Sequence, residues 1–267
     1  MKIRSLLYHD VLPDGAASEF SGFSGASAFA YKLGTTQFET HLAGIHEGAT
    51  RAGVPVSTIE RVLHGKLKES ILITFDDGGV SALLHAAPML EARGFRGHFF
   101  IATDYIGKPG FLTEAQIREL EARGHVIGSH SCSHPLRMAD LSHDDLLREW
   151  KQSLERLSSI LGRKVELASV PGGLYSRAVG LAASQSGVKI LFTSEPEQYL
   201  GHVKNMMLVG RFSVVRSDSP QYAARLAGGD QWLCRKQWAL WNTKKLVKSI
   251  AGRPYLWARE RYFRARH

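Results

Sequence analysis

Cysteine and long hydrophobic runs are both scarce in this sequence. The only two cysteines, Cys132 and Cys234, lie far apart and form no CxxC pair, so we expect two reduced thiols rather than a disulfide or a metal knuckle. No apolar stretch reaches the roughly eighteen residues that a membrane-spanning helix needs. The short apolar run at the start is interrupted by His9 and Asp10, which is unlike an export signal. These absences predict a cytoplasmic protein.

Positive charge is unevenly distributed along the chain. Of the 34 Lys and Arg residues, ten fall in residues 228–267 beside only two acidic residues, so the net charge of +9 belongs almost entirely to that segment. The 267 residues, 44% of them hydrophobic, suit one α/β domain with an appendage. We therefore predict a domain over residues 1–227 and a basic, aromatic-rich C-terminal extension over residues 228–267.

Short β-like runs alternate with amphipathic helical stretches over the first 227 residues, which is typical of a parallel α/β fold. About seven such units predict a distorted (β/α)7-type barrel related to the TIM barrel, with an open doubly wound sheet as the alternative. The expected strands are Ile3–His9, Ile71–Phe75, Gly97–Ala102, His125–Ser129, Glu166–Val170, Lys189–Thr193 and Met207–Val214.

Local signals place several helix ends and one loop. Thr113 and Gln116 form a predicted capping box, and Ser142 is the expected N-cap of a helix that stops at Gly162. Another helix is expected over Val80–Arg93. The Gly- and Ser-rich segment Ser18–Ala30 is expected to be a loop near the barrel mouth.

Polar residues follow four of the expected strands, at the end where barrel enzymes place their chemistry. Asp76 and Asp77 come after one strand and His9 after the first. His130 and His134 follow a third, and a Pro-Gly-Gly turn at residues 171–173 follows a fourth. Each of these features alone is more often part of a turn or a polar loop. Because all of them occur at the ends of strands, together they favour an active site.

One carboxylate and two imidazoles can hold a divalent metal and leave positions open for water. Such a metal lowers the pKa of its bound water to around 7 and polarises a carbonyl. The second aspartate could accept a proton, and His9 could donate one to a leaving amine nitrogen.

Two motifs resemble those of a known family. Residues 74–78 read TFDDG and residues 130–134 read HSCSH, which is similar to the paired motifs of the polysaccharide deacetylases, carbohydrate esterase family 4 with its NodB homology domain. The resemblance spans about Leu6 to Ser217. It implies a distorted barrel, a divalent metal, commonly zinc, held by Asp77, His130 and His134, and Asp76 as general base.

The third family motif is only partly present. The family usually carries an arginine before its Pro-x-Gly, but residues 168–173 read ASVPGG. This resembles a branch whose motif reads A-Y-P-x-G. Arg211 is the candidate to support Asp76 in place of that arginine. The turn of Pro171, Gly172, Gly173 and Leu174 is expected to supply a backbone N–H to the oxyanion and to contact substrate.

The family's C-terminal Leu-x-x-His motif is absent. A circularly permuted branch has Tyr-His in its N-terminal strand instead, and Leu7-Tyr8-His9 resembles that pattern. The resemblance therefore implies His9 as general acid.

The extension interleaves aromatic rings with basic side chains. Four of the five tryptophans lie there, and Leu233, Leu240 and Val247 recur every seven residues, which predicts a helix. The simpler alternative is a helix that packs across the barrel with its charges in water. Trp with Lys and Arg also suits an anionic membrane surface, so contact with the inner face of the membrane is the second expectation. Nucleic acid is not the expected partner.

The combined expectation is a metal-dependent enzyme that removes N-acetyl groups from amino sugars of a glycan. By resemblance, the setting is exopolysaccharide or cell-envelope biosynthesis. Rival interpretations are a deacylase of a lipid-linked or small glycan, hydrolysis of a non-sugar amide, and a non-catalytic glycan-binding scaffold.

Overall fold

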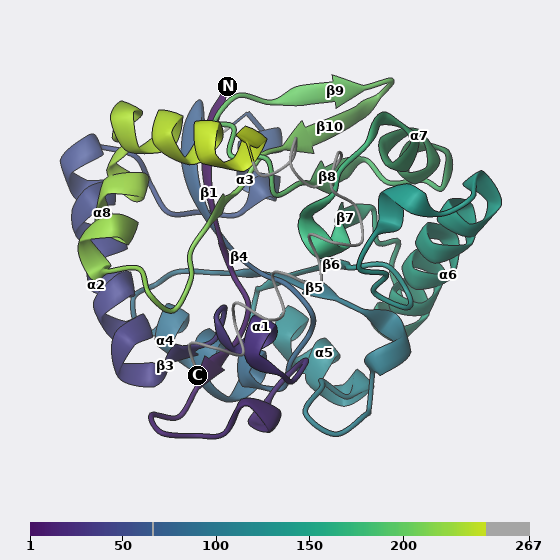
Figure 1. Ribbon diagram of the computed structural model, residues 1–267, viewed down its shortest axis with the longest axis horizontal. Coiled ribbons are helices and arrows are strands. Elements are labelled where there is room, and N and C mark those ends of the chain that lie inside the picture. The colour runs from purple at the N-terminus through teal and green to yellow at the C-terminus, as the bar shows by residue number, and fades with distance from the viewer. Residues whose placement is uncertain (66, 244–267) are drawn as a thin grey trace.

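A strongly curled sheet forms the centre of the molecule (Figure 1). The computed structural model describes residues 1–65 and 67–243. Within them, the large sheet has the order β11-β1-β4-β5-β6-β7-β8-β10-β9, and every neighbouring pair is parallel except β9–β10. The strands are β1 (Lys2–Tyr8), β4 (Glu69–Phe75), β5 (His98–Ile101), β6 (Val126–Ser129), β7 (Leu167–Ser169), β8 (Ile190–Phe192), β9 (Gly201–Val203), β10 (Met206–Val209) and β11 (Phe212–Ser213), with a separate pair formed by β2 (Val11–Leu12) and β3 (Leu33–Gly34).

The curl makes the sheet a half-barrel, consistent with the distorted barrel expected from the sequence. The first six predicted strands are confirmed to within two residues, but the seventh, Met207–Val214, is wrong as a single strand. The strand is interrupted at Gly210 and Arg211. The part before the interruption, β10, pairs with β8, and the part after it, β11, pairs with β1. A Cβ on Gly210 would lie 2.5 Å from the Glu195 carbonyl oxygen, so only glycine allows this close approach.

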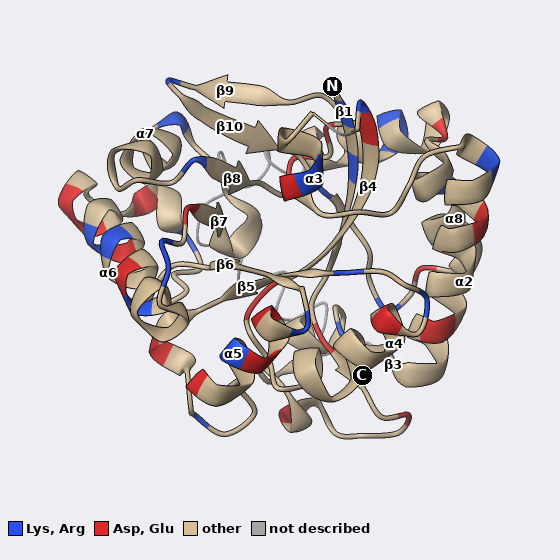
Figure 2. Cartoon of the chain, turned by 180° about the vertical axis from the view of Figure 1, so that it is seen from behind, with Lys and Arg blue, Asp and Glu red and all other residues tan. Residues whose placement is uncertain are grey.

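Helices cover the outer face of the curled sheet (Figure 1). Lys and Arg residues and Asp and Glu residues are both found along these helices, including α5 and α6 (Figure 2). No helix in the described part of the chain is long and apolar enough to cross a membrane. The helices are α1 (Ala26–Phe29), α2 (Thr35–Ala52), α3 (Ile59–Leu63), α4 (Ala87–Glu91), α5 (Glu114–Ala122), α6 (His143–Leu161), α7 (Arg177–Gln185) and α8 (Pro220–Gly228), and residues 231–243 are also helical.

The predicted helix ends are confirmed where a capping side chain carried the prediction. Thr113 and Gln116 form both hydrogen bonds of a capping box, and Ser142 accepts a hydrogen bond from the Asp145 N–H. Gly162 ends α6 with a left-handed φ of 64°. These caps satisfy backbone donors that a helix start otherwise leaves free.

Two other local predictions need correction. The segment expected as one helix over Val80–Arg93 is a π-helical stretch over residues 82–86 followed by the short helix α4. Pro88 in α4 has no N–H to donate, which accounts for a departure from regular α-helical bonding just before it. The expected loop Ser18–Ala30 contains a one-turn helix, α1.

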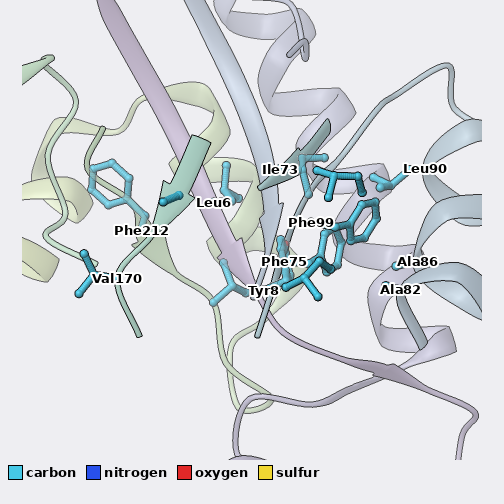
Figure 3. Close-up of a cluster of buried hydrophobic side chains, with 14 of the residues drawn as sticks. Leu6, Tyr8, Ile73, Phe75, Ala82, Ala86, Leu90, Phe99, Val170 and Phe212 are labelled. Atoms are coloured by element: carbon cyan, nitrogen blue, oxygen red, sulfur yellow. The ribbon is translucent and has the colours of Figure 1, made fainter. Parts of the chain in front are cut away.

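Aromatic side chains at the ends of the first strands pack outward against the helices (Figure 3). Tyr8 stacks on Phe75 with ring centroids 5.8 Å apart, and Phe75 stacks on Phe99 at 4.9 Å. Phe38 of α2 contacts both Tyr8 and Phe75 edge-on. Because successive side chains of a strand point to opposite faces, the residue that follows Phe75 turns toward the interior of the barrel.

The beginning of the extension packs on the domain. Leu233 and Cys234 are buried, and Gln237 donates hydrogen bonds to the Ser213 carbonyl oxygen (2.8 Å) and the Tyr222 hydroxyl (2.7 Å). The next face of the same helix is exposed, with Trp232 62% and Leu240 52% accessible. The predicted helical repeat also involves Val247, which lies outside the described residues.

Candidate active site

Polar side chains from four strand ends meet inside the curl. Asp76 and Asp77 follow β4, His130 follows β6, His9 follows β1, and Ser169 is the last residue of β7. These strands run parallel in the sheet, so their carboxyl ends lie at the same edge. All but His9 are buried, and His9 is half-buried.

Asp77, His130 and His134 bring three ligand atoms together. One carboxylate oxygen and two imidazole nitrogens lie within 4.8 Å of one another. The Asp77 Oδ1 atom lies 3.2 Å from His134 Nε2 and 3.5 Å from His130 Nε2, yet it has no hydrogen-bond partner in the described structure. A buried carboxylate oxygen without a partner is costly, whereas two imidazoles and a carboxylate are a favourable donor set for a divalent cation. These residues therefore fit a metal ion.

The backbone is unusual at two of these three residues. Asp77 has a φ of 76° and His134 a φ of 54°, both in the left-handed region that non-glycine residues rarely occupy. Such conformations persist only where the surroundings impose them, and they cluster at functional sites. Gly78 continues the same turn with a φ of 83°.

Asp76 is held by Arg211 rather than by the imidazoles. The guanidinium donates two hydrogen bonds, Nη1 to Oδ1 at 2.7 Å and Nη2 to Oδ2 at 2.9 Å, and Ser169 Oγ donates a third at 3.1 Å. Burial by itself raises the pKa of Asp76, but Arg211 and then His130 outweigh it and hold the pKa below its usual range. The carboxylate is thus ionised and oriented.

Arg211 is itself fixed in place. Its side chain is fully buried, and its Nε donates to the Thr193 carbonyl oxygen at 2.9 Å. The guanidinium also lies over the Phe100 ring, 5.5 Å from the centroid. The break between β10 and β11 places this arginine inside the curl, which brings it to Asp76.

Ser169 orients His130 as well as Asp76. Its hydroxyl lies 2.6 Å from His130 Nδ1, and its carbonyl oxygen lies 3.1 Å from the same nitrogen. Engaging Nδ1 leaves Nε2 to face Asp77. Burial lowers the pKa of His130 to about 4, so the ring is neutral near pH 7 and suited to bind a metal.

His134 and Asp77 shift each other's pKa in opposite directions. Burial lowers the pKa of His134, but the Asp77 carboxylate outweighs burial and raises it above the usual value. Burial raises the pKa of Asp77, but His134 and the other nearby imidazoles lower it strongly. A cation at this position would take over the role of the proton on His134.

His9 lies beside the two aspartates. It contributes to lowering the pKa of both Asp76 and Asp77, so its ring is close enough to interact with their charges. Its ring centroid is 4.8 Å from that of Tyr31, and its Nδ1 atom is buried without a hydrogen-bond partner among the described residues. The role of His9 as a proton donor stays a prediction.

The turn of residues 171–174 directly follows β7 and Ser169. Gly172 and Gly173 both have left-handed φ angles, and Pro171 is buried. A Cβ on Gly172 would lie 2.5 Å from the Leu136 carbonyl oxygen, so this turn packs on the loop that leaves His134. The turn thus lies near the candidate metal ligands, as its place after β7 predicted.

The sequence reading missed Ser169 and a buried glutamate, Glu149 of α6. Glu149 accepts hydrogen bonds from the loop between His130 and His134. The helical periodicity places Glu149 on the apolar face of its amphipathic helix, and a charged residue on that face indicates a specific buried partner. No comparable signal marks Ser169, because small polar residues are common at strand ends.

Residues 64–191 match the family model for polysaccharide deacetylase. YxkH of Bacillus subtilis, which carries the name of a polysaccharide deacetylase, is 25% identical over 73% of this chain and 65% of its own length. A chitin deacetylase from Pestalotiopsis sp is 30% identical over 42% of this chain and 37% of its own length. The chain thus spans less than two thirds of these relatives.

Solved structures share the fold. The Streptococcus pyogenes deacetylase PplD, in complex with acetate, superposes with a TM-score of 0.66 at 19% identity, covering 83% of this chain and 96% of that one. IcaB from Ammonifex degensii superposes with a TM-score of 0.67 at 23% identity, covering 85% and 97%. At these identities the likeness establishes the curled α/β fold.

The half-barrel places one carboxylate and two imidazoles at its strand ends, a donor set that fits a divalent metal ion. Over residues 64–191, the chain is similar to the polysaccharide deacetylase family.

Proposed function

We propose that this protein removes N-acetyl groups from the amino sugars of a glycan and releases acetate and a free amine. The observation that carries the proposal is the convergence of Asp77, His130 and His134 beside a second aspartate, Asp76, that Arg211 keeps ionised. Three ligands suit a divalent metal, and an adjacent carboxylate that is not needed as a ligand suits a proton acceptor.

The chain's own residues divide the work of amide hydrolysis. Asp77, His130 and His134 would hold the metal, proposed to be zinc, which activates water and polarises the scissile carbonyl when bound. Asp76 accepts the proton of the attacking water. His9 donates a proton to the amide nitrogen as the C–N bond breaks, because an expelled amine must be protonated to leave.

The turn of Pro171, Gly172, Gly173 and Leu174 is the proposed contact for substrate and for the oxyanion. It follows the strand that carries Ser169, which already touches both Asp76 and His130. Backbone N–H groups aimed at developing negative charge stabilise a transition state without having to reorganise.

The permuted arrangement expected from the Tyr-His pattern is also part of the proposal. β1 lies between β11 and the Asp-bearing strand β4, so His9 reaches the site from the start of the chain. A setting in exopolysaccharide or cell-envelope biosynthesis follows from the family resemblance.

Metal analysis combined with acetate release tests this function. The purified protein is assayed for bound metal and for acetate released from N-acetylglucosamine oligomers and from lipid-linked N-acetyl sugars, with Asp76→Asn as the inactive control that keeps all three proposed ligands. We expect about one bound metal per chain and acetate release that Asp76→Asn abolishes. Bound metal without acetate release from any of these substrates would favour a non-sugar amide as substrate. A protein that neither binds metal nor releases acetate would favour a non-catalytic glycan-binding scaffold.

An anionic membrane surface is the proposed partner of the extension. The helix over residues 231–243 exposes Trp232 and Leu240 together with Arg235 and Lys236, and the segment from 228 to 267 carries an excess of positive charge. Indole rings settle at headgroup depth while basic side chains meet lipid phosphates. The buried side of the same helix anchors it to the domain through Gln237.

Vesicle co-sedimentation tests this partner. We expect binding to vesicles containing phosphatidylglycerol and much weaker binding to phosphatidylcholine alone. The double substitution Trp232→Gln and Leu240→Gln should weaken binding several-fold. Leu63→Gln, at an exposed leucine on α3, is the matched control and should bind like the wild type. Equal binding to both lipids, or none, would exclude the anionic membrane as partner.

A further inference from the structure

Helix α6 carries two polar residues on its buried face. Glu149 and Ser153 lie among apolar side chains that pack against the sheet, and Glu149 is only 8% exposed. A carboxylate in such a position is costly unless its oxygens accept hydrogen bonds. The apolar members of this face are Leu146, Trp150, Leu154, Leu157 and Ile160.

The carboxylate of Glu149 bonds to the loop between the two candidate metal-binding histidines. Its Oε2 atom accepts hydrogen bonds from the Cys132 N–H at 2.9 Å and the Ser133 N–H at 3.0 Å. Its Oε1 atom accepts one from the Ser133 hydroxyl at 2.6 Å. Both oxygens are therefore committed to the loop.

Ser153, one turn further along α6, is linked to the same loop. Its hydroxyl lies 2.6 Å from the hydroxyl of Ser129, and Ser129 Oγ accepts a hydrogen bond from the Ser131 N–H at 3.1 Å. The backbone N–H groups of residues 131, 132 and 133 thus all donate hydrogen bonds either to α6 itself or to Ser129, which is bonded to α6.

These contacts hold a loop whose backbone is strained. Ser131 has a φ of 60° and His134 a φ of 54°, both left-handed, and no glycine lies between His130 and His134. A loop of this kind needs outside contacts to keep its shape. The direction of the His134 side chain depends on that shape, since His134 immediately follows Ser133.

We propose that Glu149 is a positioning residue that sets metal affinity by fixing the loop between His130 and His134. Partners that orient metal ligands affect affinity even though they do not touch the metal. The inference rests on the proposed metal centre, and it adds a residue outside the two sequence motifs. It predicts that loosening the loop weakens metal binding while the fold remains.

Glu149→Gln is the direct test, because the amide nitrogen that replaces one oxygen cannot accept a hydrogen bond. Affinity for Zn²⁺ is measured by competition with a chromophoric chelator, and the Co²⁺-substituted protein is examined by its visible absorption spectrum. Thermal unfolding of the metal-free protein is recorded in parallel. We expect Zn²⁺ affinity about 10- to 100-fold weaker and a changed Co²⁺ spectrum.

Two further variants make the outcome decisive. Ser133→Ala removes one of the three hydrogen bonds and should weaken Zn²⁺ binding several-fold, which keeps the test valid if Glu149→Gln does not fold. Glu155→Gln changes an exposed glutamate of the same helix and should bind Zn²⁺ like the wild type.

The outcomes separate this inference from the proposed function. Wild-type Zn²⁺ affinity and an unchanged Co²⁺ spectrum in a folded Glu149→Gln protein would overturn the inference. If Glu149→Gln does not fold, wild-type Zn²⁺ affinity in Ser133→Ala would overturn it. A wild-type protein that binds neither metal would instead overturn the metal centre itself.

Discussion

Arg211 and Asp76 form a buried, two-point ion pair across 135 residues of sequence, with contacts of 2.7 and 2.9 Å. The pair joins the break between β10 and β11 to the end of β4. It orients the proposed base and keeps it ionised. The two segments come together because β11 and β4 both pair with β1 in the sheet.

Replacing Arg211 with lysine should shift the pH dependence of the reaction. Lysine keeps the positive charge but cannot form the planar two-point contact, so it holds the pKa of Asp76 down less effectively. Since Asp76 must be deprotonated to act as base, the acidic limb of kcat/KM should move to higher pH. A pH profile of acetate release measures this shift, and an unchanged acidic limb would exclude control of the base by Arg211.

Replacing Arg211 with methionine should lower the stability of the fold as well as the activity. Removing one partner of a buried ion pair leaves an uncompensated charge, which typically destabilises a protein by about 3–5 kcal/mol. Urea unfolding of Arg211→Met beside the wild type measures the loss. A change below about 1 kcal/mol would mean that Asp76 is solvated or protonated when the arginine is gone.

His9→Ala should separate proton donation from metal binding. Loss of a general acid lowers turnover by roughly 10²–10⁴ while leaving the three proposed ligands in place. The measurement pairs kcat for acetate release with metal content. Loss of metal in this variant would contradict the proposed role, since it would make His9 a ligand.

The sequence predicted the parts of the site that lie in short, ordered motifs. Asp76, Asp77 and His130 come at the ends of predicted strands, His134 lies four residues after His130, and parallel strands align their ends, so local pattern was enough. The role of Ser169 could not be inferred in the same way, because its hydrogen bonds join two strand ends. Glu149 contacts the histidine loop only because α6 packs beside it.

The fold was predictable to a similar extent. Strands and capped helices followed from periodicity and from cap residues such as Thr113. The split of the last predicted strand did not follow from the sequence. It depends on the close approach of residue 195 to Gly210, a tertiary contact between the segments that follow the paired strands β8 and β10. Arg211 was therefore a candidate for contact with Asp76 but could not be placed there from the sequence.

Glu91 should make stability sensitive to acid away from the site. It pairs with Arg123 at 2.8 Å and lies 2.8 Å from His125 Nε2, and the hydrogen bonds from Arg123 hold its pKa at about 2. A carboxyl whose pKa is lowered by folding stabilises the protein above its unfolded pKa of about 4.3, and this stabilisation is lost as pH falls toward 2. The group is partly exposed, so solvent screening limits the effect to about 1 kcal/mol.

Unfolding at a series of pH values tests this assignment. Glu91→Gln should lower stability at pH 7 and should lose less stability than the wild type between pH 5 and pH 3. Glu155→Gln, at an exposed site on α6, should follow the wild-type curve. Parallel curves for wild type and Glu91→Gln would show that another carboxylate governs the acid response.

Lys32 and Asp10 form a second buried pair that ties the segment before α2 to the end of β1. Lys32 is 1% exposed, and its Nζ lies 3.5 Å from Asp10 Oδ2 and donates to the carbonyl oxygens of Ser18 and Ser21. Asp10 Oδ1 accepts hydrogen bonds from the hydroxyls of Ser21 at 2.6 Å and Ser81 at 2.7 Å.

Lys32→Met should therefore destabilise the protein by about 3–5 kcal/mol, because it leaves the Asp10 carboxylate buried without its cation. Adding Asp10→Asn removes that charge, so the double variant should be more stable than Lys32→Met alone, which urea unfolding can measure. Lys151→Met, at an exposed lysine of α6, is the control and should change stability by less than about 0.5 kcal/mol. If the double variant is no more stable than the single one, the lysine acts through its contacts with Ser18 and Ser21 rather than through the ion pair. Because Asp10 adjoins His9 and Lys32 adjoins Tyr31, a true ion pair also predicts that Lys32→Met lowers turnover at temperatures where it remains folded.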